Sequence, residues 1–291
     1  MIEPAGRAAR TSKPHTGEPL PHESAKLHVT GEALYTDDIG APADALHAYV
    51  GLSQATHARI KHLNLDAVRK APGVVCVLTA SDIPGSSDIG PVYEGDPLIA
   101  SDTVEFRGQI LFAVAAVSNK AARRAARLAE IEYEMLPAIL DSQTGHERES
   151  YVRPMHCQRR GDAETAIAEA PMKLEGAFQS GGQEQMYLEG QASLAIPDED
   201  GKMLVYSSTQ HPSEGQKLVA EVLNIPLSHV TVQVRRMGGA FGGKETNANQ
   251  WACLAALLAH KTSRPVRLKL SRAEDFILTG KRHPFLSKYR V

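Results

Sequence analysis

The stretch RRMGGAFGGKET, residues 235–246, forms the junction that defines the second half of this chain, with four glycines around a single phenylalanine. A strand-like run, HVTVQVRRM (229–237), leads into the glycines, and an apolar run typical of a helix, NANQWACLAALLAHK (247–261), follows them. Backbone N–H groups and the helix dipole at such a junction can hold an anionic group. The sequence therefore predicts a glycine loop that binds a ligand.

Two other interpretations of this loop remain open. From Gly238 it runs Gly-x-x-x-x-Gly-Lys, like a phosphate-binding P-loop, but Glu245 stands where a P-loop has the Ser or Thr that binds magnesium. A carboxylate at that position would repel a triphosphate. The dinucleotide pattern G-x-G-x-x-G also fails, because Ala240 interrupts its spacing. A nucleotide site is one alternative, and a tight turn without a ligand is the other.

Length and composition indicate an ordinary globular protein. The chain has 291 residues, enough for two domains of roughly 100–200 residues each. Apolar residues make up 42% and charged residues 23%, and the net charge is −2, so nothing indicates a nucleic-acid or membrane-surface partner. No apolar run approaches the roughly 20 residues of a membrane span, and the Pro-rich start of the chain lacks the apolar core of a secretion signal. We expect a cytoplasmic protein.

Residue types that often carry catalysis form no other recognisable site. Cys76, Cys157 and Cys253 are isolated and no C-x-x-C pair occurs, so neither a disulfide framework nor an iron–sulfur or zinc site is encoded. We expect all three cysteines to lie as small apolar residues in a reducing compartment. The paired carboxylates Asp37 and Asp38 are typical of a turn, with acid–base chemistry as the alternative.

The chain is expected to contain two domains of mixed α and β structure. We predict a flexible lead-in over residues 1–22, a first domain over 23–138, a polar linker over 139–162 and a second domain over 163–291. Apolar runs and turn signals predict strands at 47–53, 73–80, 109–117, 189–197, 201–208, 229–237, 264–271 and 284–291. Helices are predicted at 118–134, where a strand could begin at 131, and at 212–224 and 247–261.

Six motifs carry a resemblance to a known family. They are GEALYTDDI (31–39), PGVVCVLTASDIP (72–84), FRGQILFAVAA (106–116), GGQEQMYLEGQ (181–191), SSTQHPSE (207–214) and RRMGGAFGGKE (235–245). With these motifs in this order, the sequence from about Leu20 to Val291 resembles the molybdopterin-binding subunit of xanthine dehydrogenases, in the molybdenum hydroxylase family that includes aldehyde oxidases. The resemblance implies the α+β class: an α/β-hammerhead domain followed by the first part of a molybdenum-cofactor-binding domain.

The resemblance also implies an activity, cofactors and partners. It implies hydroxylation of a purine, hypoxanthine or xanthine on the route to urate, with the oxygen taken from water. The cofactor is molybdenum bound to molybdopterin. Electrons then pass to iron–sulfur clusters and FAD on a partner subunit and finally to NAD, so a heteromeric complex is expected. The absence of paired cysteines here agrees with iron–sulfur clusters on another subunit.

Four residues match functional positions of the family. Gln210 occupies the position whose side-chain amide hydrogen-bonds an oxygen ligand of molybdenum, while Phe241 and Gly242 match the loop whose backbone N–H groups approach the oxo ligand and the cofactor. Glu245 matches the carboxylate that hydrogen-bonds the purine and helps to stabilise charge developing on it. Aldehyde oxidases generally lack an acid there, so Glu245 favours a purine. No residue binds the metal directly, because the pterin holds it.

Two departures from the family pattern limit these expectations. Gln185 stands where relatives usually have histidine. The family's substrate-binding arginine, stacking phenylalanines and catalytic glutamate base all fall beyond Val291, so no catalytic residue is expected in this chain, and Arg282 and His283 receive no catalytic role. We therefore expect the front portion of a subunit that is inactive by itself. An aldehyde-oxidase-like hydroxylase and an inactive scaffold subunit are the alternatives.

Overall fold

The protein is described from a computed structural model, which covers Gly17 and residues 19–291. Two compact units are present, the first ending at Leu34 and the second running from Tyr35 to Val291. The described part of the first unit contains one short helix, α1 (Ala25–Thr30), which ends at Gly31 in the left-handed conformation with a φ of 75°. Most of the predicted lead-in, residues 1–22, lies outside the described residues.

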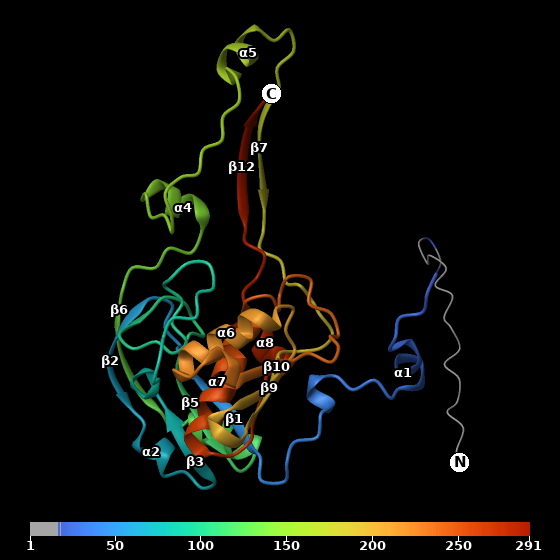
Figure 1. The fold of residues 1–291 in the computed structure, drawn as a ribbon. Coiled ribbons are helices and arrows are strands. Elements are labelled where there is room, and N and C mark those ends of the chain that lie inside the picture. Colours follow the sequence, from blue (N-terminus) through green and yellow to red (C-terminus); the bar gives the residue numbers. More distant parts are fainter. Residues whose placement is uncertain (1–16, 18) are drawn as a thin grey trace, which may run out of the picture. The chain divides into compact units, whose positions relative to one another are not determined.

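A seven-stranded sheet joins the two halves of the second unit (Figure 1). Its order is β10-β9-β8-β11-β1-β5-β3. The strands are β1 (Leu46–Leu52), β3 (Val74–Leu78), β5 (Ile110–Ala116), β8 (Ala192–Pro197), β9 (Met203–Ser207), β10 (Val230–Gln233) and β11 (Val266–Lys269). The junction is the parallel pair β1–β11, in which Leu46 lies opposite Val266. One sheet therefore contains strands from both predicted domains. The bounds of these two domains remain a prediction.

The burial of β5 explains why its sequence is an uninterrupted apolar run. Ala113 and Ala115 belong to the hydrophobic cluster under α6 (Pro212–Leu223) and α7 (Asn247–Thr262). The alternate residues Phe112 and Val114 belong to a second cluster, with α2 (Asp66–Arg69) and α3 (Asn119–Ala126). Since successive side chains of a strand point to opposite faces, β5 is covered by helices on both sides.

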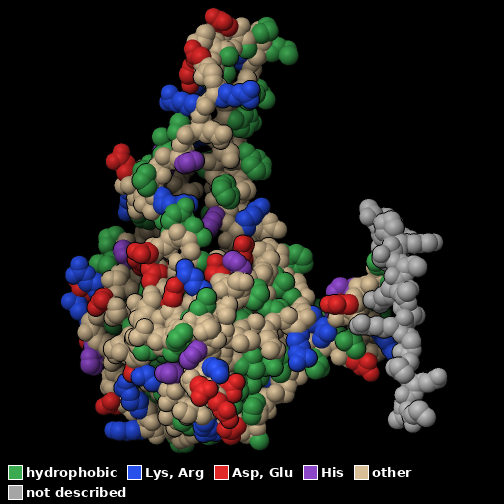
Figure 2. Space-filling model, viewed as in Figure 1, with side chains coloured by type: hydrophobic (Ala, Val, Ile, Leu, Met, Phe, Trp, Pro, Cys, Tyr) green, Lys and Arg blue, Asp and Glu red, His purple; other side chains and the backbone are tan. Residues whose placement is uncertain are grey.

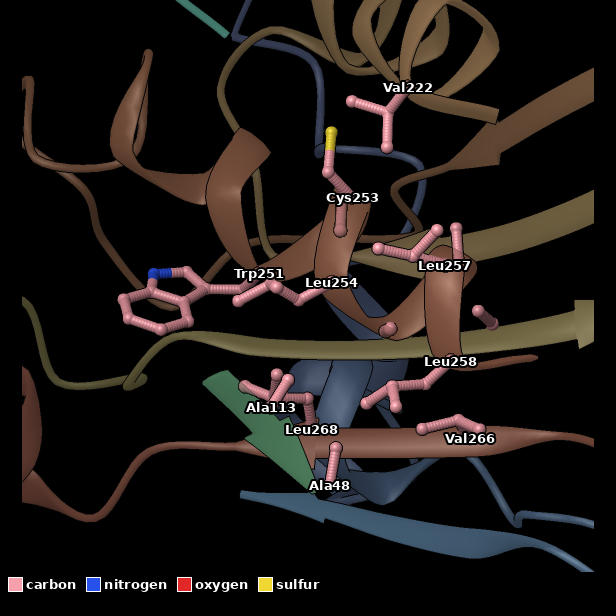
Figure 3. Packing of buried hydrophobic residues seen from close by; sticks show 14 of the residues in the cluster. Ala48, Ala113, Val222, Trp251, Cys253, Leu254, Leu257, Leu258, Val266 and Leu268 are labelled. Atoms are coloured by element: carbon pink, nitrogen blue, oxygen red, sulfur yellow. The ribbon is translucent and has the colours of Figure 1, made fainter. Parts of the chain in front are cut away.

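Helix α7 contributes more residues to the large cluster than any other element, with every residue from 251 to 259 in it. Figure 3 shows Trp251, Leu254 and Leu258 of this helix together with Ala48 and Leu268 from the strands of the sheet. The three helical side chains are at most 1% exposed. Burying a large apolar side chain contributes about 1.5–3 kcal/mol, so α7 anchors the glycine loop that precedes it to the core.

The remaining elements lie outside the central sheet. A three-stranded sheet has the order β4-β2-β6, and β12 pairs with β7 in an antiparallel ribbon. The bounds are β2 (Ala58–Asn64), β4 (Thr103–Val104), β6 (Glu130–Met135), β7 (Glu175–Ser180), β12 (Phe285–Arg290), α4 (Ser142–Glu147), α5 (Ala163–Glu169) and α8 (Arg272–Leu278). The helix predicted over 118–134 is thus two elements, α3 and β6, and the predicted linker contains α4.

The structure confirms the predicted turn at Asp37 and Asp38 and the predicted setting of two of the three cysteines. Asp38 closes a 3-10 turn, in which its Oδ2 accepts a hydrogen bond from the Tyr35 N–H at 3.0 Å. Cys253 is buried and Cys76 is half-buried, but Cys157 is exposed, so the expectation of an apolar setting is wrong there. Its neighbours are polar residues that are themselves exposed and offer no core to join.

The distribution of surface charge and the lengths of the helices are relevant to possible nucleic-acid and membrane partners. On the visible face of the unit from Tyr35 to Val291, side chains of Lys and Arg are interspersed with those of Asp and Glu (Figure 2). Within the described part of the chain, no helix combines the length and apolar character needed to cross a membrane.

Candidate functional site

The glycine loop connects β10 to α7 and contains three residues in the left-handed region. The φ angles are 90° at Gly239, 52° at Phe241 and 89° at Gly242. Glycine adopts this conformation without strain, but a bulky side chain such as Phe241 does so at a cost of about 1–3 kcal/mol. Phe241 is also 76% exposed, so burial of its ring does not offset that cost. Such strain in an exposed loop is typical of a functional site.

The side chain of Gln210 is fixed against this loop. Its Oε1 accepts hydrogen bonds from the N–H groups of Gly242 and Lys244, both at 3.2 Å. The backbone N–H of Gln210 donates to the carbonyl of Lys244 at 3.0 Å. Because two N–H donors face the same atom, that atom must be the oxygen of the amide. The structure thus brings Gln210 and Gly242 into direct contact.

Of the hydrogen-bond donors carried by Gln210, Phe241 and Gly242, two have no acceptor in the described part of the protein. Within the described residues, neither the Gln210 Nε2 group nor the Phe241 N–H donates to a protein acceptor. The Gly242 N–H, in contrast, is already bound to Gln210. Phe241 and Gln210 therefore present the donors that an oxygen-bearing ligand can use, while Gly242 supplies the backbone conformation that joins them.

Lys244 points away from this surface and into the protein. Its side chain is fully buried, and its Nζ lies 3.0 Å from Glu189 Oε2 and 4.8 Å from the centroid of the Tyr187 ring. Burial lowers the pKa of Lys244 below its usual value, and the neighbouring Glu189 carboxylate opposes that shift. A P-loop lysine contacts the phosphates of its nucleotide, whereas this ammonium group is engaged inside the protein. The arrangement disfavours a nucleotide site.

Glu189 is a structural partner that sequence reasoning missed. Its Oε2 accepts a hydrogen bond from the Gly238 N–H at 2.9 Å, in addition to its ion pair with Lys244. Its own N–H donates to the Gly238 carbonyl at 3.1 Å. Glu189 lies in the motif GGQEQMYLEGQ, but a glutamate 55 positions from its lysine gives no local signal of a pair.

A buried polar network lies behind the loop. The Tyr187 hydroxyl donates to Asp275 Oδ1 at 2.5 Å, and Gln191 Nε2 donates to both the Tyr187 hydroxyl and the Gly243 carbonyl at 3.1 Å. Burial, followed by the hydrogen bond to Asp275, raises the pKa of Tyr187 above its ordinary value. The Tyr187 hydroxyl therefore stays protonated and remains a hydrogen-bond donor. The network fixes the backbone of Gly243 through its carbonyl, which accepts from Gln191.

Glu245 lies apart from these groups. It follows the buried Lys244 and is exposed, and no side-chain hydrogen bond or ion pair joins it to another described residue. Its carboxylate is free to accept hydrogen bonds from a molecule in solution. The structure thus gathers Gln210, Phe241 and Gly242, whereas Glu245, which directly precedes the N-cap of α7, makes no hydrogen bond with these three described residues. No group of three or more His, Cys, Asp or Glu residues suited to a metal ion occurs in the described chain.

Two cavities border this region. A cavity of about 430 Å³ is lined by Phe241 together with Gln183, Glu184, Gln185 and Arg282. Gln185, the departure from the family pattern, has a buried Oε1 without a hydrogen-bond partner among the described residues. A larger cavity, about 680 Å³, is lined by other residues, including Asp37, Glu189 and Lys269. We place the candidate site at the smaller cavity, because it is lined by Phe241, whereas the larger cavity meets the glycine loop at Gly238.

Family comparisons match both halves of the chain. Residues 145–291 match the molybdopterin cofactor-binding domain, and residues 30–137 match the a/b hammerhead domain of aldehyde oxidase and xanthine dehydrogenase. Mouse xanthine dehydrogenase/oxidase is 40% identical over 276 residues, which cover 94% of this chain and 21% of the mouse protein. Xanthine dehydrogenase of Dictyostelium discoideum is 39% identical over 274 residues, covering 94% of this chain and 20% of that protein. The chain thus spans about a fifth of these relatives.

Solved structures share the fold. Aldehyde oxidoreductase from Desulfovibrio gigas aligns with a TM-score of 0.80 at 24% identity, covering 93% of this chain and 32% of that one. Quinoline 2-oxidoreductase from Pseudomonas putida 86 aligns with a TM-score of 0.77 at 26% identity, covering 88% of this chain and 35% of that one. The predicted fold class, an α/β-hammerhead domain followed by a molybdenum-cofactor-binding α+β domain, is confirmed.

Proposed function

Since the chain belongs to the aldehyde oxidase and xanthine dehydrogenase family, we propose that it forms part of a molybdenum-dependent hydroxylase whose substrate is a purine. The observation that carries the proposal is the side-chain amide of Gln210, fixed through its oxygen by the glycine loop. This contact leaves the Gln210 Nε2 donor facing away from the protein's own acceptors.

The residues at the loop fit the oxygen-rich end of a molybdenum cofactor. Gln210 Nε2 and the Phe241 N–H are two unused donors, and such donors bind anionic oxygen ligands without adding charge. We assign them to an oxygen ligand of the metal, with Gly242 shaping the loop between them. When bound, the cofactor would supply the two-electron oxidation of the substrate, with the added oxygen coming from water. The chain's own contribution is to bind and orient that group.

Glu245 is the group that we assign to the substrate. Its exposed carboxylate has no side-chain partner among the described residues and can accept hydrogen bonds from the N–H groups of a purine. A negative charge at this position also stabilises positive charge or an acidic proton on the ring as the reaction proceeds. An aldehyde offers no such donors, so Glu245 favours a purine over an aldehyde.

The proposed function also includes the groups that accept electrons from the substrate. We infer a cytoplasmic, heteromeric complex in which a partner subunit holds iron–sulfur clusters and FAD and passes electrons to NAD. We assign the general base to no residue of this chain, and we therefore expect the 291-residue chain alone to give no turnover. Its role in the complex is to form one side of the cofactor site.

The test is expression of the complete complex in a host that makes the molybdenum cofactor. We expect molybdenum bound in proportion to the chain, with hypoxanthine oxidised in preference to an aromatic aldehyde. Glu245→Ala should lower kcat/KM for the purine at least tenfold and leave molybdenum content unchanged. Glu199→Ala, which replaces an exposed glutamate on the turn between β8 and β9, is the matched control and should change neither.

The outcomes separate the alternatives. Preference for the aldehyde, or an unchanged kcat/KM for the purine in Glu245→Ala, contradicts the purine assignment. A complex that assembles without molybdenum contradicts the enzyme proposal and favours a scaffold subunit. Purine oxidation by the isolated chain would contradict the expectation that the base lies elsewhere.

A further inference from the structure

One carboxylate holds both ends of the glycine loop. Glu189 Oε2 accepts from the Gly238 N–H at 2.9 Å and pairs with Lys244 Nζ at 3.0 Å. Gly238 is the first glycine of the loop, and Lys244 is the last buried position before α7. The residues between these two anchors, 239–243, include all three left-handed positions of the loop. Closing the loop at both ends limits the conformations that this segment can adopt.

Lys244 also links that carboxylate to Gln210. Its N–H donates to Gln210 Oε1 at 3.2 Å, and its carbonyl accepts from the Gln210 N–H at 3.0 Å and from the Thr209 hydroxyl at 3.2 Å. Three of its polar groups are therefore used, two by the segment that carries Gln210 and one by Glu189. A displacement of the Lys244 side chain moves the backbone atoms that orient the Gln210 amide.

Stability alone does not explain a charged pair at this position. Removing a lysine and a glutamate from water is unfavourable for each ion, and apolar residues of similar volume often stabilise a fold equally well. What a buried ion pair adds is specificity, because any loop conformation that separates Glu189 from Lys244 leaves a buried charge without its partner. Tyr187 supports this pairing, since its ring lies beside the ammonium group.

We propose that the Glu189–Lys244 pair is a positioning device that closes the glycine loop and orients the Gln210 amide toward the ligand. Both residues act through Gln210 and Gly242 and touch no ligand themselves. The identity of that ligand rests on the proposed function, whereas the effect on the loop does not.

The test measures the loop directly in the full 291-residue chain. Amide hydrogen exchange is followed at Gly242 and Lys244, whose N–H groups are bound to Gln210 Oε1, and at Val205, a fully buried residue in the middle of β9. In Lys244→Met, exchange at the two loop amides should accelerate at least tenfold relative to Val205. The double variant Glu189→Gln/Lys244→Met leaves no unpaired buried charge, so it should fold even if the single variant does not, with the same acceleration in the loop.

The control breaks a different partly buried ion pair in the same unit. Arg123→Met removes the partner of Glu274 and should leave the ratio of loop to core exchange unchanged. Unaltered loop exchange in the double variant overturns the proposal. Equal acceleration at all three amides, or the same loop response in Arg123→Met, means that the pair only stabilises the fold and also overturns it.

Molybdenum content separates this inference from the proposed function. The wild type and the double variant are compared in the complete complex, and the variant is expected to lose most of its molybdenum. A wild type without molybdenum contradicts the cofactor assignment, while the exchange ratios still decide whether the pair positions the loop. A variant that keeps full molybdenum despite a mobile loop shows that positioning is not needed for retention and overturns the link to the ligand.

Discussion

At the scale of single residues, Gly243 lies where the protein has no room for a side chain. A Cβ atom there would lie 2.6 Å from Cε1 of Tyr187 and 3.1 Å from the carbonyl oxygen of Ala240. Tyr187 cannot move aside easily, because it is 1% exposed and its hydroxyl is bound to Asp275. The glycine therefore allows the loop to pack directly onto the aromatic ring.

Gly243→Ala is expected to lower the free energy of unfolding by about 1–3 kcal/mol, the usual cost of forcing an extra group into a packed site. Gly40→Ala is the matched control, because a Cβ there meets no atom within 4 Å, and it should change stability by less than about 0.5 kcal/mol. Urea unfolding of both variants measures the difference. Equal effects at the two positions would show that the contact with Tyr187 is not limiting.

At the scale of elements, α3 begins where the sequence indicates. Ser118 is its N-cap, and the serine Oγ accepts a hydrogen bond from the Ala121 N–H at 3.2 Å. This bond satisfies one of the N–H groups that the first turn of a helix leaves unpaired. Helix α3 covers the face of the sheet that holds Phe112 and Val114, so its start affects the packing of β5.

Ser118→Ala should lower the free energy of unfolding by about 0.5–2 kcal/mol, because the N-cap acceptor is lost. Ser118→Asp keeps an acceptor and should stay within about 0.5 kcal/mol of the wild type. Thermal unfolding at equal protein concentration compares the three chains. A similar loss in both variants would mean that the serine contributes through packing and not through the cap.

At the scale of the whole second unit, Glu274 of α8 connects the two halves of the chain. Its Oε1 lies 2.7 Å from Arg123 of α3 and accepts the Tyr49 hydroxyl of β1 at 2.9 Å. Although burial raises the pKa of Glu274, hydrogen bonds from Ser271 and Tyr49 and the charge of Arg123 outweigh it, and the pKa lies below its usual value. Ionised Glu274 therefore stabilises the fold.

Because the folded-state pKa of Glu274 is depressed, its contribution is complete above the unfolded value of roughly 4.3 and disappears as pH falls through the folded-state pKa. Glu274→Gln should lower the free energy of unfolding by about 1–3 kcal/mol at pH 7. The difference from the wild type should shrink as the pH falls below about 4.3. Urea unfolding across this pH range tests the linkage, and a difference independent of pH contradicts it.

Patterns along the chain predicted the fold better than the site. The hairpin of β8 and β9 follows from alternating apolar residues around a tight turn, and α7 follows from its length and composition. Strand β2 was missed, because its exposed face carries Arg59, Lys61 and His62 and weakens the apolar signal. The pairing of β1 with β11 has no local signal, since register between distant strands depends on tertiary packing.

The candidate site was predicted only through resemblance. Periodicity indicated a ligand-binding loop, but it gave no reason to place Gln210 against Gly242, 32 positions away. Lys244 shows most clearly what the sequence could not predict. Its position after two glycines matches the lysine of a P-loop, and only the fold reveals that its side chain turns inward to Glu189. Burial is a property of the folded chain, so the sequence pattern alone could not distinguish these directions.

The shared sheet has a consequence for biosynthesis. Strand β1 is complete at Leu52, yet its parallel partner β11 begins only at Val266, more than two hundred residues later. A ribosome adds about 5–20 residues per second, so one edge of β1 waits roughly ten seconds or longer for its neighbour. During that interval β1 and β5 form an apolar sheet with an open edge, which is prone to aggregation. The nascent chain is therefore expected to need chaperone protection until β11 has emerged.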